Sequence, residues 1–361
     1  MEVSAVVHIR QAARLAAQLL ALVAGGVALC PIDPASAADI KPMLVTCPAS
    51  GHDFFGLEIR AVNTLKSRDG DFLLRAEGGN QYATWIWTCP YCFFSARQEV
   101  FTQERKVEFD PSSVETMELT YEAMESERLQ LLIPPALKYR NAAAYYFSIG
   151  ETPYSLGVLN LQGSWAVRMS KVSVPKGLFD TWWKSYMHVT DEGESSSEEQ
   201  QLQAVAEDLR NELNHVGRWG NKAEKLKLEF LIASTLRQAG EHRQAVPLLE
   251  KLVSMPDLEE IAEAAAKELE LARTETAFQE EALRYFKDAV KLEETLPDDR
   301  LQSIYLIGEL SRRLGNYEQA KVWFARADET PMPQLWARNM LERQKRRLAE
   351  DMAAAGGSAP R

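Results

Sequence analysis

Histidine and cysteine are scarce in this chain of 361 residues, which contains five of the first and four of the second. The sequence also lacks a serine nucleophile elbow, a glycine-rich phosphate-binding loop and a His-Glu-x-x-His helix. His188, His215 and His242 lie far apart along the chain, so they do not predict a shared site. These absences leave the common classes of hydrolase, nucleotide-binding enzyme and metalloprotease without support.

Positive charge is also in the minority. Lysine and arginine number 41 against 52 aspartates and glutamates, and the formal net charge is −11. Such a surface repels the phosphates of nucleic acids. Beyond residue 38 the chain has no apolar run of the roughly 20 residues needed to span a bilayer. We therefore expect neither a nucleic-acid partner nor a transmembrane segment after signal cleavage.

The first 37 residues have the pattern of a signal peptide. Arg10 and Arg14 precede an uncharged stretch, Leu15–Leu29, which is followed by the small residues of Ala35-Ser36-Ala37. A membrane anchor is the alternative, but this stretch of roughly 15 residues contains Gln18 and falls short of a bilayer span. We expect cleavage after Ala37 and export to a periplasm or to the outside of the cell.

Three cysteines remain once residues 1–37 are removed, namely Cys47, Cys89 and Cys92. The last two form the motif Cys89-Pro90-Tyr91-Cys92. Thiols at this spacing bind a metal together with ligands from elsewhere, or they alternate between dithiol and disulfide. These thiols are the clearest indication of chemistry in the chain.

Strand-like runs separated by turns predict a small β-rich module over residues 38–130. The runs are Leu57–Ile59, Phe72–Leu74, Ala83–Thr88 and Lys106–Phe109, and the turns are Asp69–Asp71 and Gly78–Asn80. The pattern becomes helical from Pro134, which predicts a helical hairpin over residues 131–189. An acidic, serine-rich linker with almost nothing to bury is expected over residues 190–199.

Residues 200–352 show a recurring frame of small and large apolar residues, which is typical of tetratricopeptide repeats. The frame consists of Ala245, Leu249 and Leu252, then Ala282, Phe286 and Ala289, then Ala320, Phe324 and Ala327. Successive copies are 37 and 38 residues apart, and Pro256, Pro297 and Pro331 follow the expected second helices. The pattern predicts three stacked helical hairpins that fold without the front half of the chain.

Several short motifs between residues 44 and 175 belong to one recognisable pattern. They are Cys47-Pro48, Asp69-Gly70-Asp71-Phe72, Trp87-Thr88-Cys89-Pro90-Tyr91-Cys92, Pro135-Ala136-Leu137-Lys138-Tyr139, Ala142-Ala143, Leu156-Gly157 and Trp165-Ala166-Val167-Arg168. In these residues the chain resembles a bacterial family called domain of unknown function 2225, whose members usually carry two Cys-x-x-Cys pairs. The resemblance implies a zinc-ribbon-like module followed by helical repeats, and it implies no established activity.

The chain departs from that family at the first cysteine pair. Ser50 stands where the resemblance implies a cysteine, and Phe93 stands where a glycine is common, so a four-thiolate site is impossible. His52 is a candidate fourth ligand through an imidazole nitrogen, and Asp53 is a weaker one. The candidate zinc ligands are Cys47, His52, Cys89 and Cys92. The alternatives are a surface histidine in a turn, and a disulfide within the Cys-x-x-Cys motif that leaves Cys47 free.

Thiol–disulfide exchange is the rival function, since glutaredoxins carry the same four residues as Cys89-Pro90-Tyr91-Cys92. Such an enzyme needs the first thiol exposed at a helix N-terminus, where the helix dipole lowers its pKa. The segment after this motif has a short strand-like run and long helices instead of a compact βαββα unit, although Pro134-Pro135 offers a proline to face the dithiol.

These patterns predict an α+β protein that is mostly α, with a β-rich cysteine module followed by stacked helical hairpins. A capping helix is expected over Pro333–Met352 and a disordered tail over residues 353–361. Stacked hairpins leave a continuous curved surface, so we expect a non-enzymatic scaffold whose groove binds a protein or peptide partner. Zinc is the expected cofactor.

Overall fold

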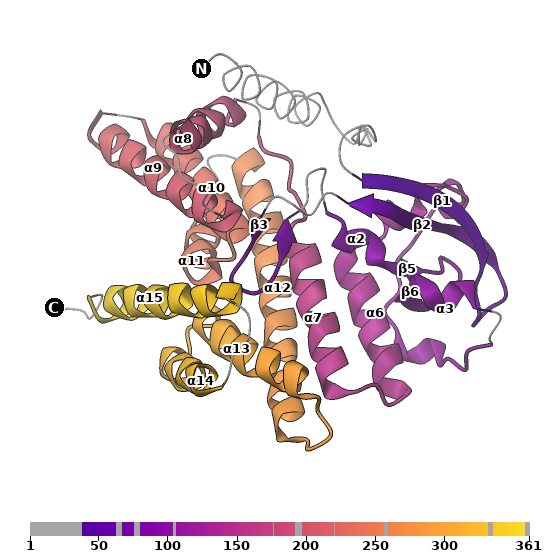
Figure 1. The fold of residues 1–361 in the computed structure, drawn as a ribbon. Helices are drawn as coiled ribbons and strands as arrows, with labels where there is room; N and C mark the ends of the chain where they lie inside the picture. Colours follow the sequence, from indigo (N-terminus) through magenta and orange to yellow (C-terminus); the bar gives the residue numbers. More distant parts are fainter. Residues whose placement is uncertain are drawn as a thin grey trace, which may run out of the picture.

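The computed structural model describes residues 38–357 apart from 63–66, 76–79, 104–105, 176, 192–196, 220, 256–258 and 331–334. The expected signal peptide therefore lies outside the described residues. The fold is α+β and mostly helical, with the strands in the N-terminal part of the chain (Figure 1). This agrees with the fold class predicted from the sequence.

Three two-stranded antiparallel sheets make up the β structure of the described residues. β1 (Ala38–Thr46) pairs with β2 (Asp53–Val62), β3 (Ser67–Arg68) with β4 (Leu74–Arg75), and β5 (Ile86–Thr88) with β6 (Ser95–Arg97). The sequence patterns do not predict β1, because Pro42 interrupts its run. A strand with a single partner tolerates proline, since one of its edges needs no ladder hydrogen bond.

Three of the four expected strands are extended only in part or not at all. Residues 83–85 belong to the short helix α2 (Tyr82–Trp85), so only the second half of the run Ala83–Thr88 is extended. Lys106–Phe109 has no regular structure. Phe72 has a φ of 71°, a left-handed conformation that turns the chain and leaves only Leu74 of that run in a strand.

Helices form most of the remaining described chain, and none of them is long and apolar enough to cross a bilayer. They are α3 (Gln98–Thr102), the 3-10 helix η1 (Pro111–Ser113), α4 (Tyr121–Met124), α5 (Leu129–Leu132), α6 (Pro135–Ser148), α7 (Pro153–Arg168), α8 (Phe179–Asp191), α9 (Glu198–Trp219), α10 (Lys222–Gln238), α11 (His242–Val253), α12 (Glu259–Lys291), α13 (Pro297–Arg313), α14 (Tyr317–Glu329) and α15 (Leu335–Gly357).

Local signals place several helix ends. Asn221 and Glu224 form a reciprocal capping box at the start of α10, which satisfies backbone N–H groups that have no partner within the helix. Gly240 and Gly315 follow α10 and α13 with φ values of +79° and +78°. Glycine adopts this left-handed conformation without a Cβ clash, so each of these helices ends and the chain reverses.

The second of the three expected hairpins is a single helix. α12 runs from Glu259 to Lys291, so no turn separates its two halves. The other two expected hairpins each have a left-handed glycine between their helices, whereas residues 259–291 contain neither glycine nor proline. The missing helix-ending residues are the signal in the sequence that this turn does not form.

α7 takes the place of the missing antiparallel helix (Figure 1). In the third frame Gly308 of α13 faces Phe324 of α14, and a Cβ on Gly308 would lie 2.6 Å from a ring carbon. In the second frame the glycine that faces Phe286 is Gly157 of α7, where a Cβ would lie 2.8 Å from the ring. The close partner of α12 is therefore a helix from the front half of the chain.

The main hydrophobic core crosses the boundaries expected near residues 130 and 190. It contains Leu73 and Ile86 from the β-rich part, Leu159 from α7, and Phe286 and Leu310 from later helices, all of them buried. A separate core around the cysteines also includes buried residues of α5 and α6. The β-rich part and the helices therefore pack as one unit rather than as successive modules.

The segment Ser67–Arg75, which contains β3 and β4, lies among the helices (Figure 1). The N–H of Gly70 donates to Glu199 of α9 at 3.0 Å, and the hydroxyl of Tyr305 of α13 donates to the Gly70 carbonyl at 2.6 Å. The ring of Phe72 stacks on Tyr305 with 4.9 Å between centroids. The turn predicted at Asp69–Asp71 is therefore buried between distant helices.

A buried ionic cluster holds this segment in place. Its members are Asp69, Asp71, Arg75, Arg168, Glu199, Glu275, Glu309 and Arg313, each at most 5% exposed. Arg168 links three parts of the chain, because it donates to Asp71 at 2.6 Å and to Glu275 of α12 at 2.7 Å. Arg313 donates to Glu199 at 2.7 Å and to Glu309 at 2.7 Å.

The two aspartates of the cluster differ in acidity. Burial raises the pKa of Asp69 to about 6, although the neighbouring Arg75 guanidinium opposes this shift. Burial also acts to raise the pKa of Asp71, but Arg168 and Arg313 outweigh it and lower that pKa to about 2. Asp71 is therefore the firmly ionised partner of the arginines.

Glu199 corrects the expectation of an exposed linker over residues 190–199. α8 continues to Asp191 and α9 begins at Glu198, and residues 192–196 lie outside the described part. The Glu199 carboxylate is 1% exposed and accepts hydrogen bonds from Arg313 and from Arg347. Burial of a carboxylate is stable here only because arginines from distant helices compensate its charge.

The C-terminal end also differs from its prediction. α15 corresponds to the expected capping helix but continues to Gly357, so residues 353–357 are helical rather than part of a disordered tail. Three of these five residues are alanine, which has the highest helix propensity. Local propensity therefore favours the extension of α15, although the apolar spacing did not indicate it.

Candidate metal centre

Two turns of the same design carry the cysteines. Cys47 follows β1, and its N–H donates to the His52 carbonyl while its own carbonyl accepts from Gly51. Cys89 follows β5, and its N–H donates to the Phe94 carbonyl while its own carbonyl accepts from the Phe93 N–H. Gly51 and Phe93 both have positive φ values, 76° and 57°. The two turns are therefore equivalent, residue by residue.

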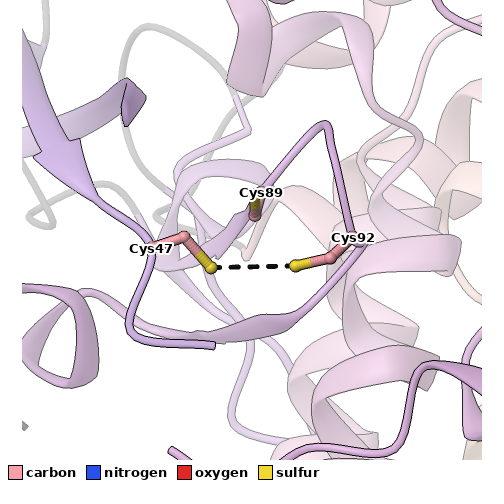
Figure 2. Close-up of side chains that lie close together, drawn as sticks. All are labelled: Cys47, Cys89 and Cys92. Atoms are coloured by element: carbon pink, nitrogen blue, oxygen red, sulfur yellow. Dashed lines mark hydrogen bonds between the residues drawn. The ribbon is translucent and has the colours of Figure 1, made fainter. Parts of the chain in front are cut away.

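The three sulfur atoms meet between these turns (Figure 2). The Sγ atoms of Cys47 and Cys92 are 3.7 Å apart, and all three sulfurs lie within 4.8 Å of one another. Thiolates bound to one tetrahedral zinc at about 2.3 Å lie about 3.8 Å from each other. The arrangement of the three thiols therefore fits a zinc ion.

The surroundings of the thiols are apolar. Cys47 and Cys89 are 1% and 0% exposed, and Cys92 is partly buried. Trp87, Phe94 and Phe54 pack in the same core. All three cysteines are free thiols. A buried group of soft donors with no disulfide between them suits a metal whose thiolate bonds are shielded from water.

The candidate fourth ligands, His52 and Asp53, lie outside the group of side chains placed to hold a metal. The His52 ring is exposed and stacks on the Tyr91 ring, with 4.4 Å between centroids. Asp53 accepts a hydrogen bond from the Thr46 hydroxyl at 2.6 Å. Within the described residues, the group of side chains placed to hold a metal consists of the three cysteines alone. The structure thus gives His52 and Asp53 contacts different from those of a ligand.

Hydrogen bonds couple the acidities of the thiols. Bonds from Cys89 and then Cys92 lower the pKa of Cys47, and the bonds made to Cys47 raise the pKa of Cys89 and of Cys92. The ionisation of each thiol therefore depends on the other two. A metal would bind by displacing the remaining protons, because only thiolates coordinate well.

A family comparison matches the chain over both parts of its fold. The model of a bacterial family described as "Uncharacterized protein conserved in bacteria (DUF2225)" matches residues 43–273 and 265–349. The two matches overlap and together cover well over half of the chain. The chain belongs to the DUF2225 family. Neither the curated proteins nor the solved structures provide a match.

Membership in the DUF2225 family extends beyond the resemblance seen in the sequence, because the match continues through the helices to residue 349. The motif Asp69-Gly70-Asp71-Phe72 carried that resemblance, and the structure places it in the ionic cluster. Arg168, at the end of another such motif, is the partner of Asp71. The acidic Asp71 in one motif and the basic Arg168 in another were thus the signal in the sequence for a buried ion pair between the two motifs.

Proposed function

We propose that this DUF2225 protein is a non-enzymatic scaffold whose β-rich part is fixed by one zinc ion bound to Cys47, Cys89 and Cys92. The observation that carries the proposal is the convergence of three sulfurs, those of the buried Cys47 and Cys89 and of the partly buried Cys92, at distances that suit tetrahedral zinc. Bound zinc would supply a crosslink between the turn after β1 and the turn after β5. Short sheets of two strands have little stability alone, so a crosslink of this kind stabilises them.

Thiol–disulfide exchange is less well supported by the same geometry. Cys89 is 0% exposed, and the residues after it form a turn that leads into β6 rather than a helix. The attacking thiol of such an enzyme needs access to its substrate and a helix N-terminus to stabilise the thiolate. The described surroundings of Cys89 supply neither of these features.

The metal proposal has a direct test. Purified wild-type protein is expected to hold about one zinc per chain, and Cys47→Ser is expected to release it as completely as Cys92→Ser does, because each removes one of three thiolates. Elemental analysis after dialysis measures the zinc. The control is His52→Ala, which should keep the metal. Metal-free wild-type protein, or a Cys47→Ser variant that retains zinc, would contradict the proposal.

We also propose that the helices bind a protein or peptide partner on their outer surface, in an exported protein. The support is the packing of helices side by side, which offers an extended surface to a partner. Val322 of α14 is an apolar side chain that is 66% exposed. The proposal of export rests on the N-terminal sequence pattern alone.

A pull-down with the native full chain tests partner binding. A specific partner is expected to be recovered by the wild-type protein and recovered less by Val322→Asp, because a charge on the outer face of α14 opposes an apolar contact. Leu44→Asp is the control, since Leu44 is also exposed but lies in β1. Equal recovery by Val322→Asp and wild type would place the contact elsewhere.

A further inference from the structure

Ser50 occupies the same place in its turn as Cys92 does in the other. The turn bonds at Cys47 and Cys89 are equivalent, and Ser50 and Cys92 each lie three residues after the first cysteine. The motifs Cys47-Pro48-Ala49-Ser50 and Cys89-Pro90-Tyr91-Cys92 therefore present four corresponding donors, three sulfurs and one hydroxyl. A tetrahedral metal takes four donors, so the Ser50 hydroxyl would be the fourth donor to a metal bound by the three sulfurs.

The contacts of Ser50 agree with this position. Its Oγ lies 3.6 Å from the Cys89 Sγ, within hydrogen-bonding distance. The hydroxyl thus contacts the cluster of sulfurs through Cys89. A neutral hydroxyl is a weaker donor to zinc than a thiolate or an imidazole, which are the usual ligands. The fourth bond of the centre is therefore the one most easily exchanged.

The fourth position borders the protein surface. A surface cavity of about 480 Å³ is lined by Thr46, Cys47, Pro48, Ala49, Ser50, Gly51, Gln103, Lys106 and Val107. Ser50 therefore lines this cavity together with Cys47, within reach of a small molecule. Lys106 brings a positive charge to this cavity, which favours a negatively charged donor over a neutral one.

Building on the proposed zinc centre, we propose that Ser50 marks an exchangeable coordination position that takes a small thiol as an external ligand. The thiol loses its proton to solvent, and its sulfur replaces the Ser50 hydroxyl on the metal, so that the centre gains a fourth thiolate. Three protein ligands with one open position are the arrangement of metal sites that bind external molecules. The departure at Ser50 thus changes a closed site into an accessible one.

Cobalt(II), whose visible absorption reports its ligands, provides the test on the full chain. The wild-type protein loaded with cobalt under anaerobic conditions is expected to show a spectrum of three thiolates and one oxygen, and 2-mercaptoethanol should shift it toward four thiolates in a saturable way. Ser50→Cys is expected to show the four-thiolate spectrum without added thiol, to ignore the thiol, and to bind cobalt at least about 10-fold more tightly. Ser50→Ala should keep the metal and respond to less thiol than the wild type.

The controls separate this proposal from the zinc proposal. His52→Ala is expected to behave like the wild type, whereas an altered starting spectrum together with a response to less thiol in that variant would make His52 the fourth ligand and overturn the proposal. A wild-type spectrum that does not change when the thiol is added would overturn it as well, while the three-cysteine centre would stand. Wild-type protein that binds no cobalt would overturn both proposals.

Discussion

Replacement of Arg168 by methionine is expected to lower the free energy of unfolding by about 3–5 kcal/mol, the usual effect of removing one partner from a buried ion pair. Arg168 is buried and contacts Asp71 at 2.6 Å, Glu275 at 2.7 Å and Asp69 at 3.4 Å. Methionine fills similar space but provides no charge, so three buried carboxylates lose a shared cation. Urea denaturation followed by circular dichroism measures the change.

Arg273→Met is the matched control for this prediction. Arg273 pairs with Glu250 at 2.8 Å, but both side chains are more than half exposed. Water screens such a pair, so its loss should cost less than about 1 kcal/mol. Equal effects of the two substitutions would mean that the ionic cluster does not stabilise the fold more than a surface pair does.

A fragment of residues 198–357 is expected to lose the cooperative unfolding transition of the full chain. Phe278 and Phe286 of α12 pack against Gly163 and Gly157 of α7 in the intact protein, and the fragment would expose them to water. It would also lack Asp71 and Arg168, which compensate charges on later helices. This result would correct the expectation that the repeats fold without the front half.

The measurement compares urea transitions of this fragment and of a control that begins at Ala38, at equal concentration. The control retains every described contact and should unfold cooperatively, whereas the fragment should show a broad, shallow loss of helical signal. If the fragment unfolds as sharply as the control and at the same urea concentration, α7 and the ionic cluster are dispensable for the later helices.

The burial of the apolar frame was predictable from spacing. All nine frame residues, from Ala245 to Ala327, are buried, because a stripe at helical spacing must face a core. The frame did not predict which helix covers it. Phe286 faces Gly157 of α7 rather than a residue of its own hairpin, since α12 contains no residue that would end it.

The candidate metal centre was predictable in part from the spacing of its cysteines along the chain. Three cysteines in a short region indicate one cluster, and the structure brings their sulfurs together. The nearby position of His52 suggested a ligand, but the turn that begins at Cys47 directs Ser50 toward the sulfurs instead. Distance along the chain does not decide which side chain faces inward in a turn; the backbone conformation does.

The sequence by itself determined the features that depend on neighbouring residues: the α+β composition with mostly helices, the glycine that ends α10, the apolar stripe of each helix and the shared cysteine cluster. Only the tertiary structure decided which distant elements meet. Asp71 and Glu199 look like solvated residues in their local sequence, and they are buried because arginines from other helices compensate their charge. Local sequence patterns do not indicate that compensation, because the free-energy cost of burying a charge depends on groups far away along the chain.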